Sequence, residues 1–155
     1  MDYREFVNSA STIINNTDKS KKVPKQYPAY YIYGTHRELF AREIARKTKR
    51  YLISVNAYDN HYLKQQFSLC SRDLVIINMD SYCLFCDRDY AYRRALNQLR
   101  FVQYNRDLPI IMVSKYAPEI VFDFDYGSTE AVKFRIDYHV VNADDEIKLP
   151  ATWIW

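Results

Sequence analysis

The stretch Asp73-Leu-Val-Ile-Ile-Asn-Met-Asp80 decides the fold of this chain. Its five apolar residues, rich in β-branched side chains, lie between two aspartates. Such a short apolar run is typical of a strand buried on both faces, and such strands occupy the middle of parallel sheets that helices flank. Asp80 ends the run, at the place where an acidic residue of many nucleotide-binding α/β proteins holds the metal. The stretch therefore predicts an α/β fold and makes Asp80 a candidate ligand-binding residue.

Segments on both sides of this strand alternate between strand and helix patterns. Further strands are predicted at 29–33, 51–55 and 109–113, and helices at 36–49, at 60–69 and from Asp87 or Asp89 to about 104. Strands that alternate with helices need right-handed crossovers, which produce a mostly parallel sheet with helices on both faces. We therefore predict a three-layer α/β fold.

The two ends of the chain differ in pattern from this core. Residues 1–28 are predicted to form a leader, with one short amphipathic helix and then the basic linker 19–25. Residues 29–155 are predicted to form a single α/β domain. Its carboxyl-terminal tail is predicted to be rich in β-structure, because residues 119–125 and 133–141 alternate like half-exposed strands on either side of a turn.

Composition limits the class of protein. The chain has 155 residues, of which 48% are hydrophobic, so it can form one ordinary globular core. No apolar run approaches the roughly 20 residues that cross a membrane, and the charged start lacks the apolar core of a signal peptide. The three cysteines are an odd number, which argues against a secreted disulfide framework. We expect a soluble intracellular protein, in the cytoplasm of its own or a host cell, with no membrane partner.

Several turns should meet at the carboxyl edge of the predicted sheet, where open parallel sheets bind their ligands. The candidate ligand-binding residues at this edge are Gly34, Thr35, His36, Arg37, Asp80, Ser114 and Lys115. The order of segments 31–45, 74–80 and 109–115 resembles the P-loop core of AAA+ ATPases. More narrowly, it is similar to the superfamily 3 helicase domain of replication initiators from small DNA viruses. The resemblance covers residues 28–141 and implies a P-loop-like strand order and a role in viral replication.

The sequence departs from that family at both places that handle the nucleotide. A working phosphate loop needs several glycines, followed by Lys and then Ser or Thr. This chain has Gly34 alone there, and no Gly-Lys-Ser/Thr. The Walker B strand normally ends in two acidic residues, but Ser81 follows Asp80, and Lys115 replaces the usual Asn of the sensor strand. We therefore expect a catalytically degenerate domain that is not an enzyme and holds no cofactor.

Charge is unevenly distributed along the chain. Residues 1–116 carry 19 Lys and Arg against 11 Asp and Glu, whereas residues 117–155 carry 3 against 8. A basic region of this kind suits a phosphate backbone, and an acidic tail suits a basic partner. The candidate nucleic-acid-binding residues are Arg46, Lys47, Lys49, Arg50, Arg93, Arg94 and Arg100. We expect a module that binds nucleic acid or a protein, and the tail strands offer edges through which copies could form a homo-oligomer.

The alternative function is that of a thiol-disulfide oxidoreductase acting through Cys83 and Cys86. A Cys-x-x-Cys that follows a strand and opens a helix is the redox arrangement of thioredoxins and glutaredoxins, where the helix N-terminus lowers the pKa of the first thiol. The neighbouring Asp87 and Asp89 would instead raise a thiol pKa. Only 22 residues separate Cys86 from Pro109, which is short for that fold.

Metal sites have weaker support in the sequence. Cys70, Cys83, Cys86 and His61 have suitable chemistry for zinc, but the buried strand separates Cys70 from the cysteine pair. Asp73 and Asp80 lie at opposite ends of that strand, about 23 Å apart at 3.3 Å per residue, so they do not share a metal. We therefore predict no metal site.

Overall fold

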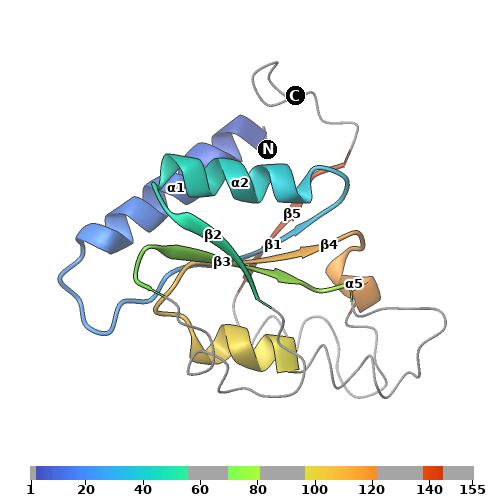
Figure 1. Cartoon of the computed structure of the whole chain (residues 1–155). Coiled ribbons are helices and arrows are strands. Elements are labelled where there is room, and N and C mark those ends of the chain that lie inside the picture. Colours follow the sequence, from blue (N-terminus) through green and yellow to red (C-terminus); the bar gives the residue numbers. More distant parts are fainter. Residues whose placement is uncertain (1–2, 56–69, 81–96, 122–137, 145–155) are drawn as a thin grey trace.

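The computed structural model of the chain describes residues 3–55, 70–80, 97–121 and 138–144 (Figure 1). The helices with defined bounds are α1 (Tyr3–Lys19), α2 (Arg37–Lys47) and α5 (Pro118–Val121). The strands are β1 (Ala29–Tyr33), β2 (Tyr51–Val55), β3 (Asp73–Asn78), β4 (Ile110–Ser114) and β5 (Tyr138–Asn142). Residues 97–104 are also helical. The strands predicted around β1, β2, β3 and β4 are confirmed to within one residue at each end.

The five strands form one sheet in the order β2-β3-β4-β1-β5, and every neighbouring pair is parallel. β4 is the middle strand, and all five of its residues are buried. β3, which begins at Asp73, lies between β2 and β4 and is buried except at Asn78. The predicted parallel α/β sheet is therefore confirmed, with its central position taken by β4 rather than β3.

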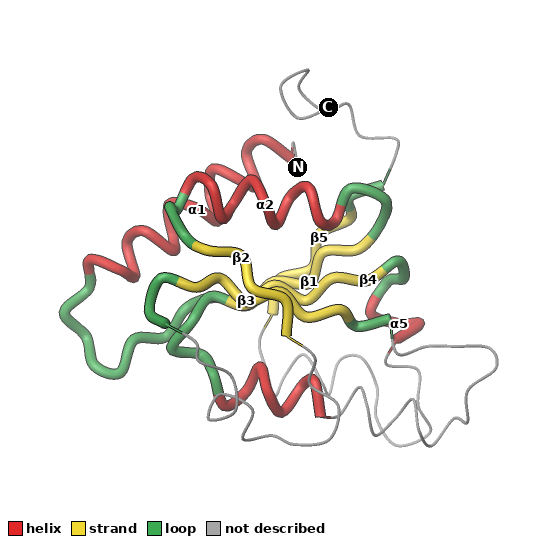
Figure 2. Tube along the Cα trace, in the orientation of Figure 1, coloured by secondary structure: helices red, strands yellow, loops and turns green. Residues whose placement is uncertain are grey.

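Helices cover both faces of the sheet, which gives the predicted three layers (Figure 2). α1 and α2 lie on one face, where Phe6, Ile14, Phe40 and Ile44 pack against the strands. The helix at 97–104 lies on the other face, and Phe101 is among its buried residues there. Among the described helices, none combines the length and apolar character needed to cross a membrane.

The amino-terminal region corrects one prediction. The sequence predicts that residues 1–28 stand outside the core, but α1 has 17 residues and its buried side chains include Phe6, Val7 and Ile14. The ring of Phe6 meets Tyr30 of β1 edge-on, with 5.4 Å between the ring centroids. α1 therefore belongs to the core, because its apolar stripe covers the part of the sheet beside α2.

The tail corrects a second prediction. The sequence predicts an extended segment at 119–121, but these residues are part of α5, where Pro118 occupies the first helical position that proline favours. β5 overlaps the end of the other predicted tail strand, 133–141, and extends one residue beyond it, yet it pairs with β1 in parallel, as a fifth strand of the main sheet. His139 and Val140 are both exposed, because β5 is an outer strand of the sheet. The predicted turn between the two tail segments and the predicted helix at 60–69 lie outside the described residues.

Candidate functional site

At the carboxyl edge, Asp80 joins the ends of β3 and β4. Its Oδ1 accepts a hydrogen bond from Ser114 Oγ at 2.5 Å and another from the Lys115 backbone N–H at 2.9 Å. Ser114 Oγ also accepts a hydrogen bond from the Tyr116 N–H at 3.0 Å. The structure therefore brings together three of the predicted ligand-binding residues. One oxygen of the Asp80 carboxylate is used to hold the turn after β4.

The same turn is also held by Tyr31 of β1. Its hydroxyl donates a hydrogen bond to the carbonyl of Tyr116 at 2.8 Å. Tyr31 is fully buried, and burial raises the pKa of its hydroxyl above the ordinary value. The hydroxyl therefore stays protonated and able to donate.

The turn after β1 is closed by the segment that follows β5. Gly34 has a φ of +104°, and its N–H donates to the Ser114 carbonyl at 3.1 Å. The His36 N–H donates to the Ala143 carbonyl at 2.7 Å, and the Arg37 N–H to the Gly34 carbonyl at 3.4 Å. These backbone donors are used within the protein. A phosphate cradle needs such donors to point at the ligand.

Asp144 adds a charge to this closed turn. A Cβ placed on Gly34 would contact the Asp144 carboxylate and lie only 2.8 Å from the backbone carbon of Ala143. The carboxylate therefore occupies the space next to the one glycine of the predicted phosphate loop. A negative charge at this place opposes the binding of a phosphate. The sequence does not indicate that Asp144 lies beside Gly34, because the position of Asp144 depends on the pairing of β5 with β1.

At the opposite, amino edge of the sheet, Arg50 forms the centre of a buried polar network. Its side chain is 1% exposed and makes an ion pair with Asp18. Arg50 Nη1 donates to the carbonyls of Ser71 and Asp73, both at 2.9 Å, and the guanidinium carbon lies 4.9 Å from the ring centre of Tyr27. This placement corrects the prediction that Arg50 contacts nucleic acid, because its donors are directed into the protein.

Asp18 is held on several sides in this network. Tyr27 donates its hydroxyl to Asp18 Oδ1 at 2.5 Å, and Arg72 lies 3.5 Å from the other carboxylate oxygen. Burial and this carboxylate together raise the pKa of Tyr27 above its ordinary value. Lys25 Nζ donates to the backbone carbonyl of Asp18 at 2.7 Å. Two arginines therefore offset the negative charge of Asp18, and the network ties the end of α1 to the linker.

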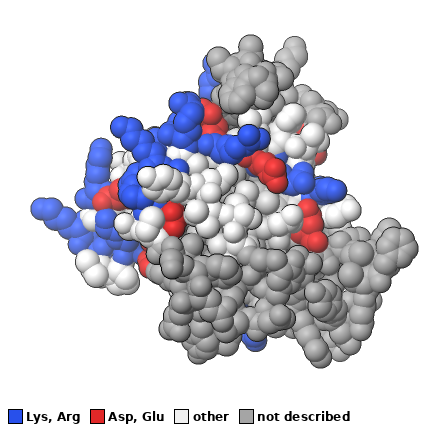
Figure 3. Space-filling model, in the orientation of Figure 1, with Lys and Arg blue, Asp and Glu red and all other residues white. Residues whose placement is uncertain are grey.

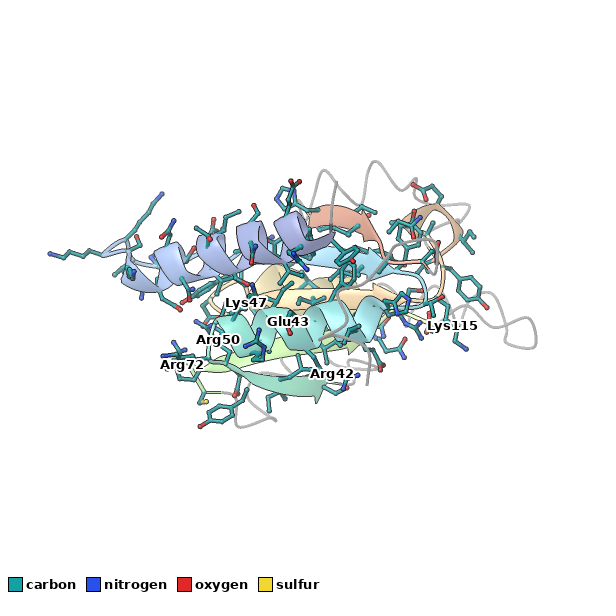
Figure 4. The ribbon with its side chains drawn as sticks, turned by 90° about the horizontal axis from the view of Figure 1, so that it is seen from above. Arg42, Glu43, Lys47, Arg50, Arg72 and Lys115 are labelled. Atoms are coloured by element: carbon teal, nitrogen blue, oxygen red, sulfur yellow. The ribbon has the colours of Figure 1, made fainter. Side chains whose placement is uncertain are left out.

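The other predicted nucleic-acid-binding residues near this edge lie at the end of α2. Arg46 is largely exposed and pairs with Glu43, and Lys47 Nζ donates to the side chain of Asn8 on α1. Figure 3 shows Lys and Arg side chains gathered over the ends of α1 and α2 and the linker. Figure 4 places Lys47, Arg50 and Arg72 at one end of the sheet and Lys115 at the other. The two groups of predicted site residues therefore belong to opposite edges.

The remaining predicted residues are separate from both groups or lie outside the described residues. Arg100 is exposed on the helix that covers the other face of the sheet. Within residues 3–55, 70–80, 97–121 and 138–144, no group of three His, Cys, Asp or Glu is placed to hold a metal ion. Cys70 is exposed, and its thiol donates to Asp73 Oδ1 at 3.2 Å. Five residues of the other predictions lie outside the described residues. They are Cys83 and Cys86 of the redox prediction, His61 of the zinc prediction, and Arg93 and Arg94 of the nucleic-acid prediction.

No family model matches the sequence, and no curated protein matches it. Among solved structures, the chain is similar to a crystal structure of DnaI, with a TM-score of 0.52 and 12% sequence identity. The match covers 97% of this chain and 84% of that one. At this identity the likeness concerns the fold alone. It supports the predicted α/β architecture, and it gives no support to the thioredoxin alternative.

Proposed function

We propose that this chain is a P-loop-like domain without nucleotide hydrolysis that serves replication as a nucleic-acid-binding module. In this proposal the ligand binds at a different edge of the sheet from the one that related folds use. The carboxyl edge, which binds nucleotides in related folds, has become a structural junction. Nucleic acid binds instead at the amino edge, through what we call the basic surface: Lys19, Lys21, Lys22, Lys25, Arg46, Lys47 and Lys49.

The observation that carries the loss of nucleotide chemistry is the closure of the Gly34 turn. The N–H groups of Gly34 and His36 are bonded to carbonyls of β4 and of the segment after β5. The Asp144 carboxylate lies against Gly34, where a phosphate would need positive or neutral surroundings. Asp80 Oδ1 is already engaged by Ser114 and Lys115. The backbone N–H groups of Gly34, His36 and Arg37 are therefore used within the protein and do not point at a triphosphate.

Support for nucleic-acid binding comes from the separation of buried and exposed charge at the amino edge. The residues from Lys19 to Arg37 contain four lysines and no Asp or Glu. The nearest acid, Asp18, is paired with Arg50 and Arg72. The exposed lysines therefore present a net positive field, which attracts a phosphate backbone through counterion release.

The first test concerns the carboxyl edge. Purified protein is titrated with ATP and Mg²⁺ by calorimetry and assayed for phosphate release. We expect neither binding at millimolar nucleotide nor turnover. Saturable ATP binding that Asp80→Ala abolishes would contradict the proposal.

The second test concerns the basic surface. Binding of labelled DNA and RNA is measured by fluorescence anisotropy at two salt concentrations, for the native chain and for K21E/K22E and K49E. We expect each reversal to weaken binding at least tenfold at low salt and to reduce the slope of affinity against salt. The matched control is Lys115→Glu, an exposed lysine at the opposite edge, which should bind like the native chain. The proposal fails if no nucleic acid binds at low salt, or if the control weakens binding as much as the basic-surface variants.

A further inference from the structure

A groove lies between the last turns of α1 and the linker that leads to β1. It has a volume of about 670 Å³. This is within the roughly 300–1,000 Å³ of sites that hold small molecules. Its lining includes Ile13, Asn16, Lys22, Val23, Lys25 and Gln26. The groove opens at the amino edge of the sheet, beside the basic surface.

The charge of the groove is positive. Among the residues that the structure describes, its lining contains Lys22 and Lys25 and no acidic side chain. Asp18 is next to it in sequence, but its carboxylate is held by Arg50, Arg72 and Tyr27. An anionic ligand is therefore the electrostatic complement of this groove.

The neutral part of the lining has a different chemistry. Thr17 Oγ1 donates a hydrogen bond to the Ile13 carbonyl at 2.9 Å, and Ser20 Oγ accepts one from the Lys22 N–H at 3.1 Å. The amide side chains of Asn16 and Gln26 are exposed and have donors and acceptors to offer a ligand. Ile13 and Val23 add apolar surface, since these residues are 43% and 88% exposed. Amides beside apolar surface suit a nucleobase, which has hydrogen-bonding edges and flat faces.

Hydrogen bonds to neighbouring segments hold both walls of the groove in place. Asp18, at the end of α1, is bonded to Tyr27, just past the linker. The Tyr27 backbone N–H donates to the Arg106 carbonyl at 2.8 Å, and Arg106 Nε donates to the Tyr27 carbonyl at 3.0 Å. Lys25 is itself bonded to the Asp18 carbonyl. A groove held in this way needs little ordering when it binds, which favours affinity.

We propose that this groove receives an unpaired base of single-stranded nucleic acid, while the neighbouring phosphates contact Lys21 and Lys22. The inference rests on the proposed function and adds a preference for single strands and a point of base contact. In a duplex the bases are stacked and paired, so their edges and faces do not enter a groove of this kind. DNA and RNA share the chemistry that the groove would recognise.

The test compares single strands with the matched duplex, using fluorescence anisotropy on the full chain at one salt concentration. Strands of DNA and RNA are used, each also in a form with abasic sites. The variant is N16A/Q26A, which removes both amides and leaves every charge in place. We expect it to weaken single-strand binding about tenfold, the effect of losing base-edge contacts, and to leave duplex binding unchanged. The matched control is Ser9→Ala, an exposed position of α1 outside the groove lining, which should change neither.

The outcomes separate the two proposals. Abasic strands should bind the native chain as weakly as intact strands bind N16A/Q26A, and circular dichroism should confirm that the variant is folded. Equal native affinity for single strand and duplex, or unchanged single-strand binding by N16A/Q26A, would overturn the groove and leave the basic surface standing. Absence of any binding at low salt would overturn the proposed function itself. A DNA-only or RNA-only result would support the groove and identify the strand.

Discussion

The two edges of the sheet use their polar side chains in comparable ways but leave different groups exposed. At the carboxyl edge, Asp80, Ser114 and the Gly34 N–H are bonded to neighbouring segments of the protein. At the amino edge, Arg50 likewise binds Asp18 and the carbonyl of Asp73. The difference lies in what surrounds these networks. The first is closed by Asp144, whereas the second is bordered by exposed lysines.

This comparison separates structural charge from charge that can meet a ligand. A buried polar group must be hydrogen-bonded, so a buried charge at the edge of a sheet is first a structural element. Arg50, which the basic cluster selects, falls into this class. The partly buried Asp80, which the family resemblance selects, likewise has one carboxylate oxygen bonded within the protein. The exposed lysines near Arg50 keep their charge in contact with solvent and are the better candidates for binding.

The largest expected effect is that of Arg50→Ala. The change leaves Asp18 without its buried partner and two carbonyls without a donor, and we expect it to lower the free energy of unfolding by about 3–5 kcal/mol. Arg46→Ala is the control, because Arg46 is 69% exposed and its pair with Glu43 should contribute less than about 1 kcal/mol. Urea denaturation measures both. Similar losses in the two variants would remove the distinction between the buried network and the exposed cations.

Gly34→Ala tests the closure of the carboxyl edge. An alanine at a φ of +104° is strained, and its Cβ would overlap Ala143 and Asp144. We expect a loss of about 2 kcal/mol or more in the free energy of unfolding. Thr35→Ala, at the exposed next position, should change it by less than about 0.5 kcal/mol. A Gly34→Ala variant as stable as the native chain would mean that the turn after β1 is open.

Ser114→Ala tests the junction of β3 and β4. The variant leaves Asp80 Oδ1 and the Tyr116 N–H each without one partner, so we expect a loss of about 1–3 kcal/mol. Asp80→Asn should keep stability within about 1 kcal/mol, because an amide oxygen still accepts both hydrogen bonds. Thermal unfolding of the two variants provides the measurement. A severe loss in Asp80→Asn would show that the negative charge itself is required.

The smallest effect is expected at Tyr30, which lies between the two edges on the face under α1. Burial raises the pKa of Tyr30 to about 12 from its ordinary value of 10.0. The folded state thus favours the protonated hydroxyl. The stability that Tyr30 contributes is fully present below pH 10 and is lost as the pH rises toward 12. Tyr30→Phe should remove part of this alkaline loss and change stability at neutral pH by less than about 1 kcal/mol. Urea midpoints compared between neutral and strongly alkaline pH test it, and an unchanged alkaline slope would contradict the assignment.

The strands and the α2 helix can be predicted because their signals are local. Runs such as 74–77 and 29–33 are apolar throughout, as strands buried on both faces must be. Parallel strands present their carboxyl ends at one edge of the sheet, so the same pattern also predicts that Asp80 lies beside Ser114, as it does. These predictions need no knowledge of distant partners.

The predictions that are wrong depend on partners distant in sequence. α1 reads as a leader because nothing in its sequence indicates that Phe6 packs on Tyr30 and α2. The burial of Arg50 follows from Asp18, Tyr27 and Asp73, which come from three separate segments. The segment 119–125 alternates like a strand, but its first three residues, Glu119-Ile-Val121, fit a helical turn equally well.

The closed turn at Gly34 also limits how this domain can be re-engineered. A graft that replaces the residues after Gly34 with a glycine-rich loop ending in Gly-Lys-Thr would restore the letters of a phosphate loop. The Asp144 carboxylate would still lie against Gly34, and the Ala143 carbonyl would still accept a hydrogen bond from the backbone N–H of residue 36. A designer who wants nucleotide affinity must therefore first redirect the chain after β5. We expect loop grafts alone to fail and grafts combined with changes at residues 143 and 144 to succeed.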